Sequence, residues 1–171
     1  MRSFRTVILT VLVGFVLSGP AIAGIYEDGM AAFEKGKYDA AIETLLPLAE
    51  EGDVRAQTAV GHIYLKRAQH NDDLREAHKW LLLSAEQGAA SAQVLLGYMY
   101  TLPLYEDDSE AIKWYRLAAG QGHVQAQLAL GDILTRTPAA SANREINRKE
   151  AVQWYRMAAD QGYVDAYLEL S

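Results

Sequence analysis

The sequence predicts an all-α fold, an α-solenoid of stacked antiparallel helix pairs. One residue pattern recurs four times, and its register is set by alanines at intervals of 36, 34 and 40 residues: Ala41, Ala77, Ala111 and Ala151. Within each unit the apolar residues recur every three or four positions, which is the period of a helix that packs on one side. A unit of this length cannot bury its apolar face alone, so consecutive units must stack on one another.

Residues 1–23 precede the repeating region and have the three-part layout of a secretory signal peptide. Two arginines form a short basic start, residues 7–17 form an apolar run, and Ala23 ends a segment of small residues. Small residues at such a position mark the cleavage site of signal peptides. We therefore expect cleavage after Ala23, which leaves residues 24–171 as a single repeat domain.

An uncleaved membrane anchor is the alternative interpretation of the N-terminal residues. The apolar run is shorter than the roughly 20 residues that span a membrane, and Pro20 interrupts any continuation. We therefore expect no stable membrane insertion after cleavage, and a location in the bacterial periplasm or outside the cell. The cleaved segment carries two arginines and no acid, so the mature chain has 148 residues and a formal charge of −8.

Each repeating unit is expected to contain two helices joined by a tight turn. The turn glycines keep the same three intervals as the alanines: Gly52, Gly88, Gly122 and Gly162. Glycine takes the left-handed conformation at a helix end without the steric penalty of a Cβ atom. Three tryptophans also share one register, which favours core packing over an aromatic cofactor site: Trp80, Trp114 and Trp154.

Three helix starts are predicted by capping boxes, in which a capping side chain is followed three positions later by glutamate. These pairs are Asp73 with Glu76, Asp107 with Glu110, and Asn147 with Glu150. The interval of 40 residues, from Ala111 to Ala151, is longer than the other two and therefore contains an insertion. We expect it to form a loop over residues 137–147, because this stretch is rich in Pro, Ala, Ser and Asn.

The repeating segments resemble the Sel1-like repeat (SLR) family, a relative of the tetratricopeptide repeat. The residues that carry the resemblance in one unit are Ala111, Trp114, Tyr115, Ala118, Ala119, Gln121, Gly122, Ala126, Gln127, Leu130 and Gly131. The match implies a tetratricopeptide-like superhelix with Sel1-like repeats at about residues 52–87, 88–121 and 122–161, and an incomplete last helix at 162–171. Residues 24–51 resemble a tetratricopeptide unit, which would cap the N-terminal end of the array.

The composition argues against several functional classes. The 16 basic and 22 acidic residues give a formal charge of −6, which disfavours a nucleic-acid partner. The chain has no cysteine, so it has no disulfide, thiolate metal site or cysteine nucleophile. This also separates it from a secreted branch of the family that carries a disulfide in each repeat and is linked to β-lactam binding. No P-loop, nucleophile elbow or zinc motif is present.

The four histidines do not have the spacing of a metal site. His62, His70 and His78 are eight residues apart and would fall on two helices and a loop, so we interpret them as surface or groove side chains. His78 replaces an apolar residue of the other units, and His123 is a variable turn residue. We therefore expect no enzyme activity, no cofactor and no metal. The enzyme alternative would place His62 and His78 beside an acid such as Asp132.

In helical repeat arrays the concave face, lined by the first helix of each pair, presents an extended groove to a peptide or a partner helix. The residues predicted to project into this groove differ between units: Arg55, Thr58, His62, Lys66, Ser91, Val94, Tyr98, Thr101, Gln125, Leu128, Asp132, Thr135 and Arg136. A solvated surface without function is the alternative for any one of these positions.

These observations favour a non-catalytic scaffold that binds a peptide or a partner protein in the concave groove. We expect a monomer whose partner is a protein rather than a nucleic acid. Two alternatives remain open at this point. One is a secreted factor that interacts with a host, which the family resemblance implies as a possible role. The other is a protein that binds a cell-wall ligand or hydrolyses it.

Overall fold

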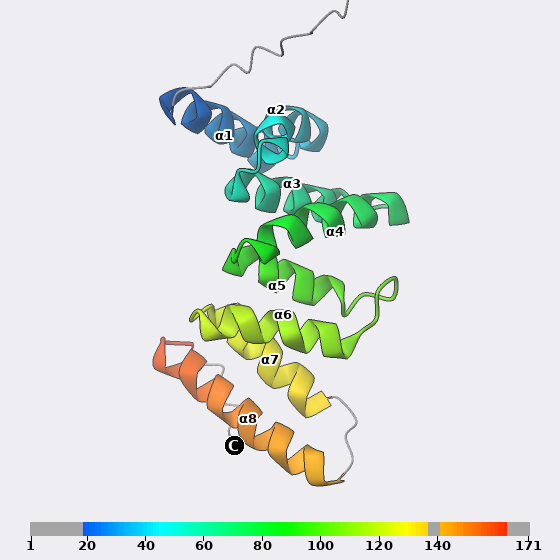
Figure 1. Cartoon of the computed structure of the whole chain (residues 1–171), viewed down its shortest axis with the longest axis vertical. Coiled ribbons are helices and arrows are strands. Elements are labelled where there is room, and N and C mark those ends of the chain that lie inside the picture. The colour runs from blue at the N-terminus through cyan, green and yellow to red at the C-terminus, as the bar shows by residue number, and fades with distance from the viewer. Residues whose placement is uncertain (1–18, 137–140, 164–171) are drawn as a thin grey trace, which may run out of the picture.

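The computed structural model describes residues 19–136 and 141–163 and forms an elongated stack of helices (Figure 1). These residues form eight helices and no strand. The helices are α1 (Gly19–Glu34), α2 (Tyr38–Glu50), α3 (Val54–Arg67), α4 (Asn71–Glu86), α5 (Ala90–Met99), α6 (Asp108–Gly120), α7 (Val124–Arg136) and α8 (Ser141–Asp160). Each helix packs mainly against its neighbours along the chain. This confirms the predicted all-α solenoid of antiparallel helix pairs.

The predicted turn glycines follow α2, α4, α6 and α8 in the left-handed conformation; with the pairs taken as α1–α2, α3–α4, α5–α6 and α7–α8, the first three of them join one pair to the next. Gly52 has a φ of 95° after α2, and Gly88 has a φ of 92° after α4. The amide nitrogens that follow donate back to carbonyl oxygens of the last helical turn, as Asp53 does to Leu48 over 3.0 Å. Each turn therefore ends one helix and directs the chain into the next helix, as expected for a helix-ending glycine.

The hydrophobic core runs through the stack as three clusters, and each cluster joins helices of consecutive pairs. Trp80 of α4 is buried among residues of α2 and α3, and Trp114 of α6 is buried among residues of α4 and α5. Trp154 of α8 packs in the same way on α6 and α7. The tryptophans thus join each second helix to the preceding pair, and their place in or against the core clusters agrees with the core packing that their register predicts.

Within each pair, a glycine of the first helix lies against a bulky side chain of the second. Alanine at these glycines would bring its Cβ atom within 2.5 to 2.8 Å of the facing side chain. The facing residues are Gly29 with Leu45, Gly61 with Leu81, Gly97 with Tyr115, and Gly131 with Tyr155. The helix axes can approach this closely only because no Cβ atom lies between them.

Buried glutamines connect consecutive pairs by hydrogen bonds. Gln93 of α5 donates from Nε2 to the carbonyl oxygen of Ala85 at the end of α4, over 3.1 Å, and accepts from Gln121 over 2.8 Å. The same arrangement recurs at the other two junctions, with Gln57 accepting from Gln87 and Gln127 accepting from Gln161. The side chain of Gln127 is fully buried. These bonds satisfy carbonyl groups that a helix end would otherwise leave unpaired.

Only one of the three predicted capping boxes has an N-cap in the expected place. Asp107 accepts hydrogen bonds from the amides of Ser109 and Glu110 and caps α6. The prediction at Asp73 was wrong, because α4 begins two residues earlier, at Asn71, and the Asp73 carboxylate pairs with Arg67.

The predicted loop over residues 137–147 was also wrong for its second half, since α8 begins at Ser141 and contains Asn147. Good helix formers and an ion pair of 3.4 Å between Glu145 and Lys149, four positions apart, favour this helical extension. Residues 137–140 lie outside the described part of the chain.

The predictions for the two chain ends stay predictions. Most of the expected signal peptide and nearly all of the expected last helix at 162–171 lie outside the described residues. The expected cleavage site after Ala23 falls within α1. Among the helices of residues 19–136 and 141–163, none has both the length and the apolar character needed to cross a membrane.

Candidate functional site

The thirteen residues predicted to line a groove lie on α3, α5 and α7 or directly after them. None of the thirteen is buried. We call the exposed surface of these three helices the A-helix face, because each begins one of the three helix pairs that follow the α1–α2 pair. Val94 and Leu128 also pack against the core, whereas Gln125 and Thr135 are exposed on α7.

Three hollows lie along the A-helix face, and nine of the predicted residues line them. The first hollow, of about 310 Å³, is lined by Arg55, Thr58 and Ser91. The central hollow, of about 420 Å³, is lined by His62, Lys66 and Tyr98. The third, of about 170 Å³, is lined by Thr101, Asp132 and Arg136. The residues of each hollow come from more than one unit.

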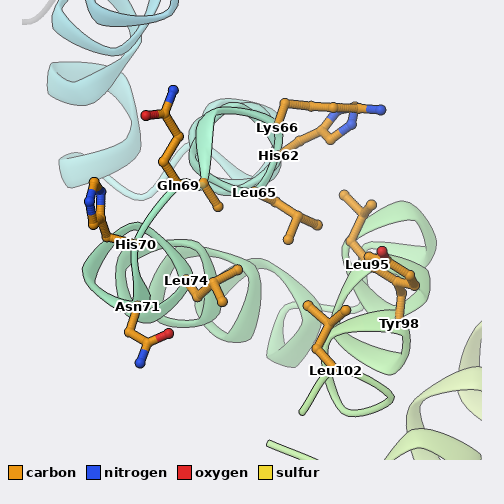
Figure 2. Close-up of a pocket in the computed structure, with 11 residues that line it drawn as sticks. His62, Leu65, Lys66, Gln69, His70, Asn71, Leu74, Leu95, Tyr98 and Leu102 are labelled. Carbon is orange, nitrogen blue, oxygen red and sulfur yellow. The ribbon is translucent and has the colours of Figure 1, made fainter. Parts of the chain in front are cut away.

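The central hollow has an apolar floor that the sequence analysis did not identify (Figure 2). The side chains of four half-buried leucines converge in it: Leu65, Leu74, Leu95 and Leu102. Leu74 comes from α4 and Leu102 from the loop between α5 and α6. Helical spacing on the first helix of each pair carries no signal for these two residues, because neither of them lies on such a helix.

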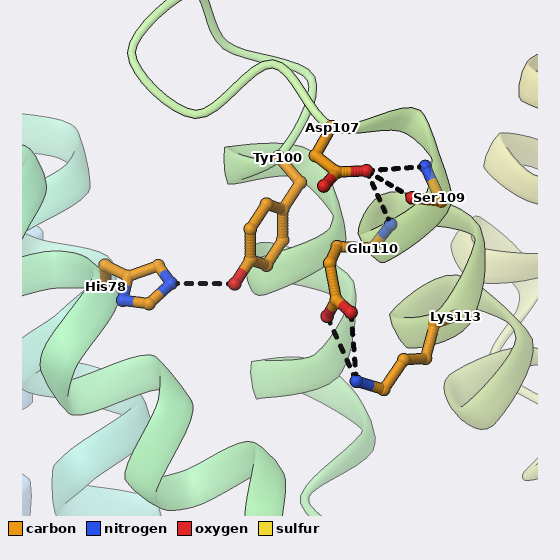
Figure 3. Close-up of polar contacts among 6 residues, drawn as sticks. All are labelled: His78, Tyr100, Asp107, Ser109, Glu110 and Lys113. Carbon is orange, nitrogen blue, oxygen red and sulfur yellow. Dashed lines mark hydrogen bonds and ion pairs between the residues drawn. The ribbon is translucent and has the colours of Figure 1, made fainter.

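An aromatic cluster fastens the loop that carries Leu102 onto α4. His78 Nε2 lies 3.1 Å from the hydroxyl oxygen of Tyr100 (Figure 3). The His78 ring also stacks on Tyr105, with centroids 4.8 Å apart. The Tyr105 hydroxyl donates to the carbonyl oxygen of Leu74 over 3.3 Å. His78 is half-buried at the position that is apolar in the other units, and it supports the wall of the central hollow.

Burial lowers the pKa of His78 below its ordinary value of 6.5, because the apolar surroundings disfavour the charged imidazolium. The pKa of His62 is lowered for the same reason and, to a smaller extent, by the charge of Lys66. Both imidazoles are thus held more strongly in the neutral form than they would be in the unfolded chain.

The lowered pKa of His78 predicts a loss of stability in acid. Between the folded and unfolded pKa values the unfolded chain binds more protons, so the free energy of unfolding falls as pH falls through 6.5. We expect His78→Phe, which keeps a ring beside Tyr105 but cannot be protonated, to lose less stability than wild type between pH 7.5 and 5.5. Urea unfolding at both pH values measures this difference. An equal loss in both proteins would contradict the prediction.

The residues of the enzyme alternative are held in different places. His62 packs edge-on against Phe33, with ring centroids 5.4 Å apart, and lines the central hollow. Asp132 lines the third hollow and accepts a hydrogen bond of 2.7 Å from the Tyr155 hydroxyl. Within the described ranges, no cluster of three or more histidines and carboxylates has the arrangement of a metal site.

Comparison with known proteins gives matches of sequence and of fold. A family model described as Sel1 repeat matches residues 54–88, 90–123 and 124–163. A crystal structure of a Sel1 repeat protein from Oxalobacter formigenes is similar at 33% identity and a TM-score of 0.67. That match covers 83% of this chain and 58% of the Oxalobacter protein. A search of curated proteins found no match.

Two further structures share the fold. The protein c5321, a protective antigen of uropathogenic Escherichia coli strains with an SLR fold, is similar at 25% identity and a TM-score of 0.71. That match covers 85% of this chain and 32% of c5321. A MamA structure is 19% identical with a TM-score of 0.61, over 89% of this chain and 80% of MamA, and shows likeness of fold alone. This chain thus spans less than two thirds of the Oxalobacter protein and about a third of the E. coli protein.

Proposed function

The chain belongs to the Sel1 repeat family, and we propose that it is a non-catalytic scaffold that binds a peptide or partner protein segment along the A-helix face. Sel1 repeat proteins are generally protein-interaction scaffolds, and their fold is typically non-catalytic. We further propose that the chain acts as a monomer in the bacterial periplasm, after removal of residues 1–23, without nucleic acid or membrane insertion.

The observation that carries this proposal is that the residues at the packing positions are the same from pair to pair, whereas the residues on the A-helix face differ. The glycines that join the helices recur in all four pairs, and the tryptophans and glutamines recur in the three pairs that follow α1–α2. The side chains of the three hollows change from unit to unit, from Arg55 and Thr58 to Asp132 and Arg136. A shared packing scheme with varied side chains on one face is what a specific binding surface requires.

We expect substitution of the A-helix face to weaken partner binding without unfolding the chain. The triple variant Arg55→Ala, Tyr98→Ala, Arg136→Ala should bind a partner captured from periplasmic extract at least about ten-fold more weakly, because aromatic and arginine side chains dominate binding energies. Titration of the purified partner against both proteins measures the loss.

A matched control for this experiment lies on the second helices of the pairs. The variant Arg75→Ala, Lys113→Ala, Leu117→Ala also removes two paired cations and one large apolar side chain. Tyr98 and Leu117 are 47% and 48% exposed. Equal binding by both triple variants and wild type would rule out the A-helix face as the binding surface.

The proposed location has its own test. We expect cell fractionation to find the chain in the periplasm, with Gly24 as the N-terminal residue by sequencing. The similarity to c5321, a protective antigen, favours a second candidate function, that of a secreted factor that meets a host. Recovery in the culture supernatant would support that second function, and a cytoplasmic chain that retains Met1 would contradict both.

A further inference from the structure

The central hollow differs from its two neighbours in that its cation has no carboxylate partner among the described residues. No aspartate or glutamate lines it, and Lys66 stands at its edge beside His62 (Figure 2). Within residues 19–136 and 141–163, no carboxylate forms an ion pair with Lys66. The central hollow therefore presents an ammonium group that no carboxylate of the described residues neutralises.

The cations of the neighbouring hollows are already paired. Arg55 lies 3.8 Å from Asp53 and over the ring of Tyr26. In the third hollow, Arg136 lies 3.2 Å from Asp108. Arg67, which ends α3 beside the central hollow, is also paired, with Asp73 of α4. As far as residues 19–136 and 141–163 show, the central hollow is the one of the three that offers an unpaired cation to a ligand.

The floor of the central hollow is suited to an apolar side chain. Its four leucines are half-buried, and the ring of Tyr98 is 47% exposed at the wall. A hollow of about 420 Å³ has room for one large apolar side chain. Because the A-helix face continues on both sides of this hollow, toward Thr58 and toward Thr101, an extended chain can pass across it.

We propose that the central hollow recognises an internal peptide segment in which a large apolar residue is flanked by an aspartate or a glutamate. This inference rests on the proposed function and names the partner chemistry of its main binding point. The apolar side chain enters between the leucines and Tyr98, and the carboxylate pairs with the Lys66 ammonium. A long acidic run is not the ligand, because the formal charge of −8 on residues 24–171 would repel it.

Selection of a random twelve-residue peptide library displayed on phage, with the full chain as target, tests the proposal. We expect the enriched peptides to carry a large apolar residue within two positions of Asp or Glu. A fluorescein-labelled copy of one such peptide should lose about ten-fold in affinity with Tyr98→Ala and about ten-fold with Lys66→Glu, as measured by anisotropy. Lys35→Glu makes the same charge change outside the hollow and should leave the affinity within about two-fold.

A charge exchange gives the sharpest readout. Replacing the acidic residue of the peptide by lysine should weaken binding to wild type and restore binding to Lys66→Glu. If peptides bind the A-helix face but respond to neither Lys66→Glu nor the exchange, this inference is overturned and the proposed function stands. If no peptide is selected, or if the A-helix variants leave binding unchanged, the proposed function fails with it. A dimer that Tyr98→Ala dissociates would assign the hollow to a second copy and overturn the inference.

Discussion

Replacing Gly97 by alanine should lower the free energy of unfolding by about 2 kcal/mol. The new Cβ atom would lie 2.8 Å from two ring carbons of Tyr115, whose side chain is buried between α5, α6 and α7. Overpacking of this kind costs about 3 kcal/mol, and the higher helix propensity of alanine offsets about 1 kcal/mol of it. Chemical denaturation of wild type and variant measures the difference.

The control for this prediction is Gly120→Ala, at the end of α6. No atom lies within 4 Å of a Cβ atom built there, so alanine should raise the stability by up to about 1 kcal/mol. The two substitutions are chemically identical and are expected to have opposite signs. A second variant that adds Tyr115→Leu to Gly97→Ala should cost less than the sum of the two changes, because leucine leaves room for the Cβ atom. Additive losses would contradict the close approach of α5 and α6.

Gln127→Ala should cost about 3 kcal/mol, because the buried amide is removed, a cavity is left and two partners lose their hydrogen bonds. Gln127 donates from Nε2 to the carbonyl oxygen of Ala119 over 3.3 Å and accepts from Gln161 over 3.0 Å. The matched control is Gln125→Ala on the same helix, where the side chain is exposed. That control should change the stability by less than about 0.5 kcal/mol. Equal losses in the two variants would show that the buried bonds do not hold α7 to the end of α6.

The parts of the fold that depend on neighbouring residues within one unit could be predicted from the sequence. The helical period, the turn glycines and the tryptophan register are fixed within one unit, and the structure shows each of them in the expected role. Asp107 also caps its helix as predicted, since only the next three residues decide this contact. The start of α8 was missed because the Ser and Asn residues of 141–147 suggest a loop, whereas the Glu145–Lys149 ion pair forms only once the helix extends through this segment.

The candidate site could be predicted only in part, because it is built from contacts between units. The variable positions of α3, α5 and α7 followed from helical spacing. The place of Leu102 in the central hollow depends on the loop that His78 and Tyr105 hold against α4, and no local pattern encodes that contact. The paired glutamines were part of the repeat motif, but a bond between Gln93 and Gln121 becomes visible only when two units are stacked.

The central claim, that partners bind along the A-helix face, is tested most directly by amide NMR spectra of the full chain during titration with a library-selected peptide. We expect the largest shift changes on α3, α5 and α7, centred on Lys66 and Tyr98, with a smaller response at the loop that carries Leu102. Residues on the exposed side of α6, such as Lys113 and Leu117, should keep their shifts. Changes concentrated on α4, α6 and α8, with α3, α5 and α7 unaffected, would contradict the claim.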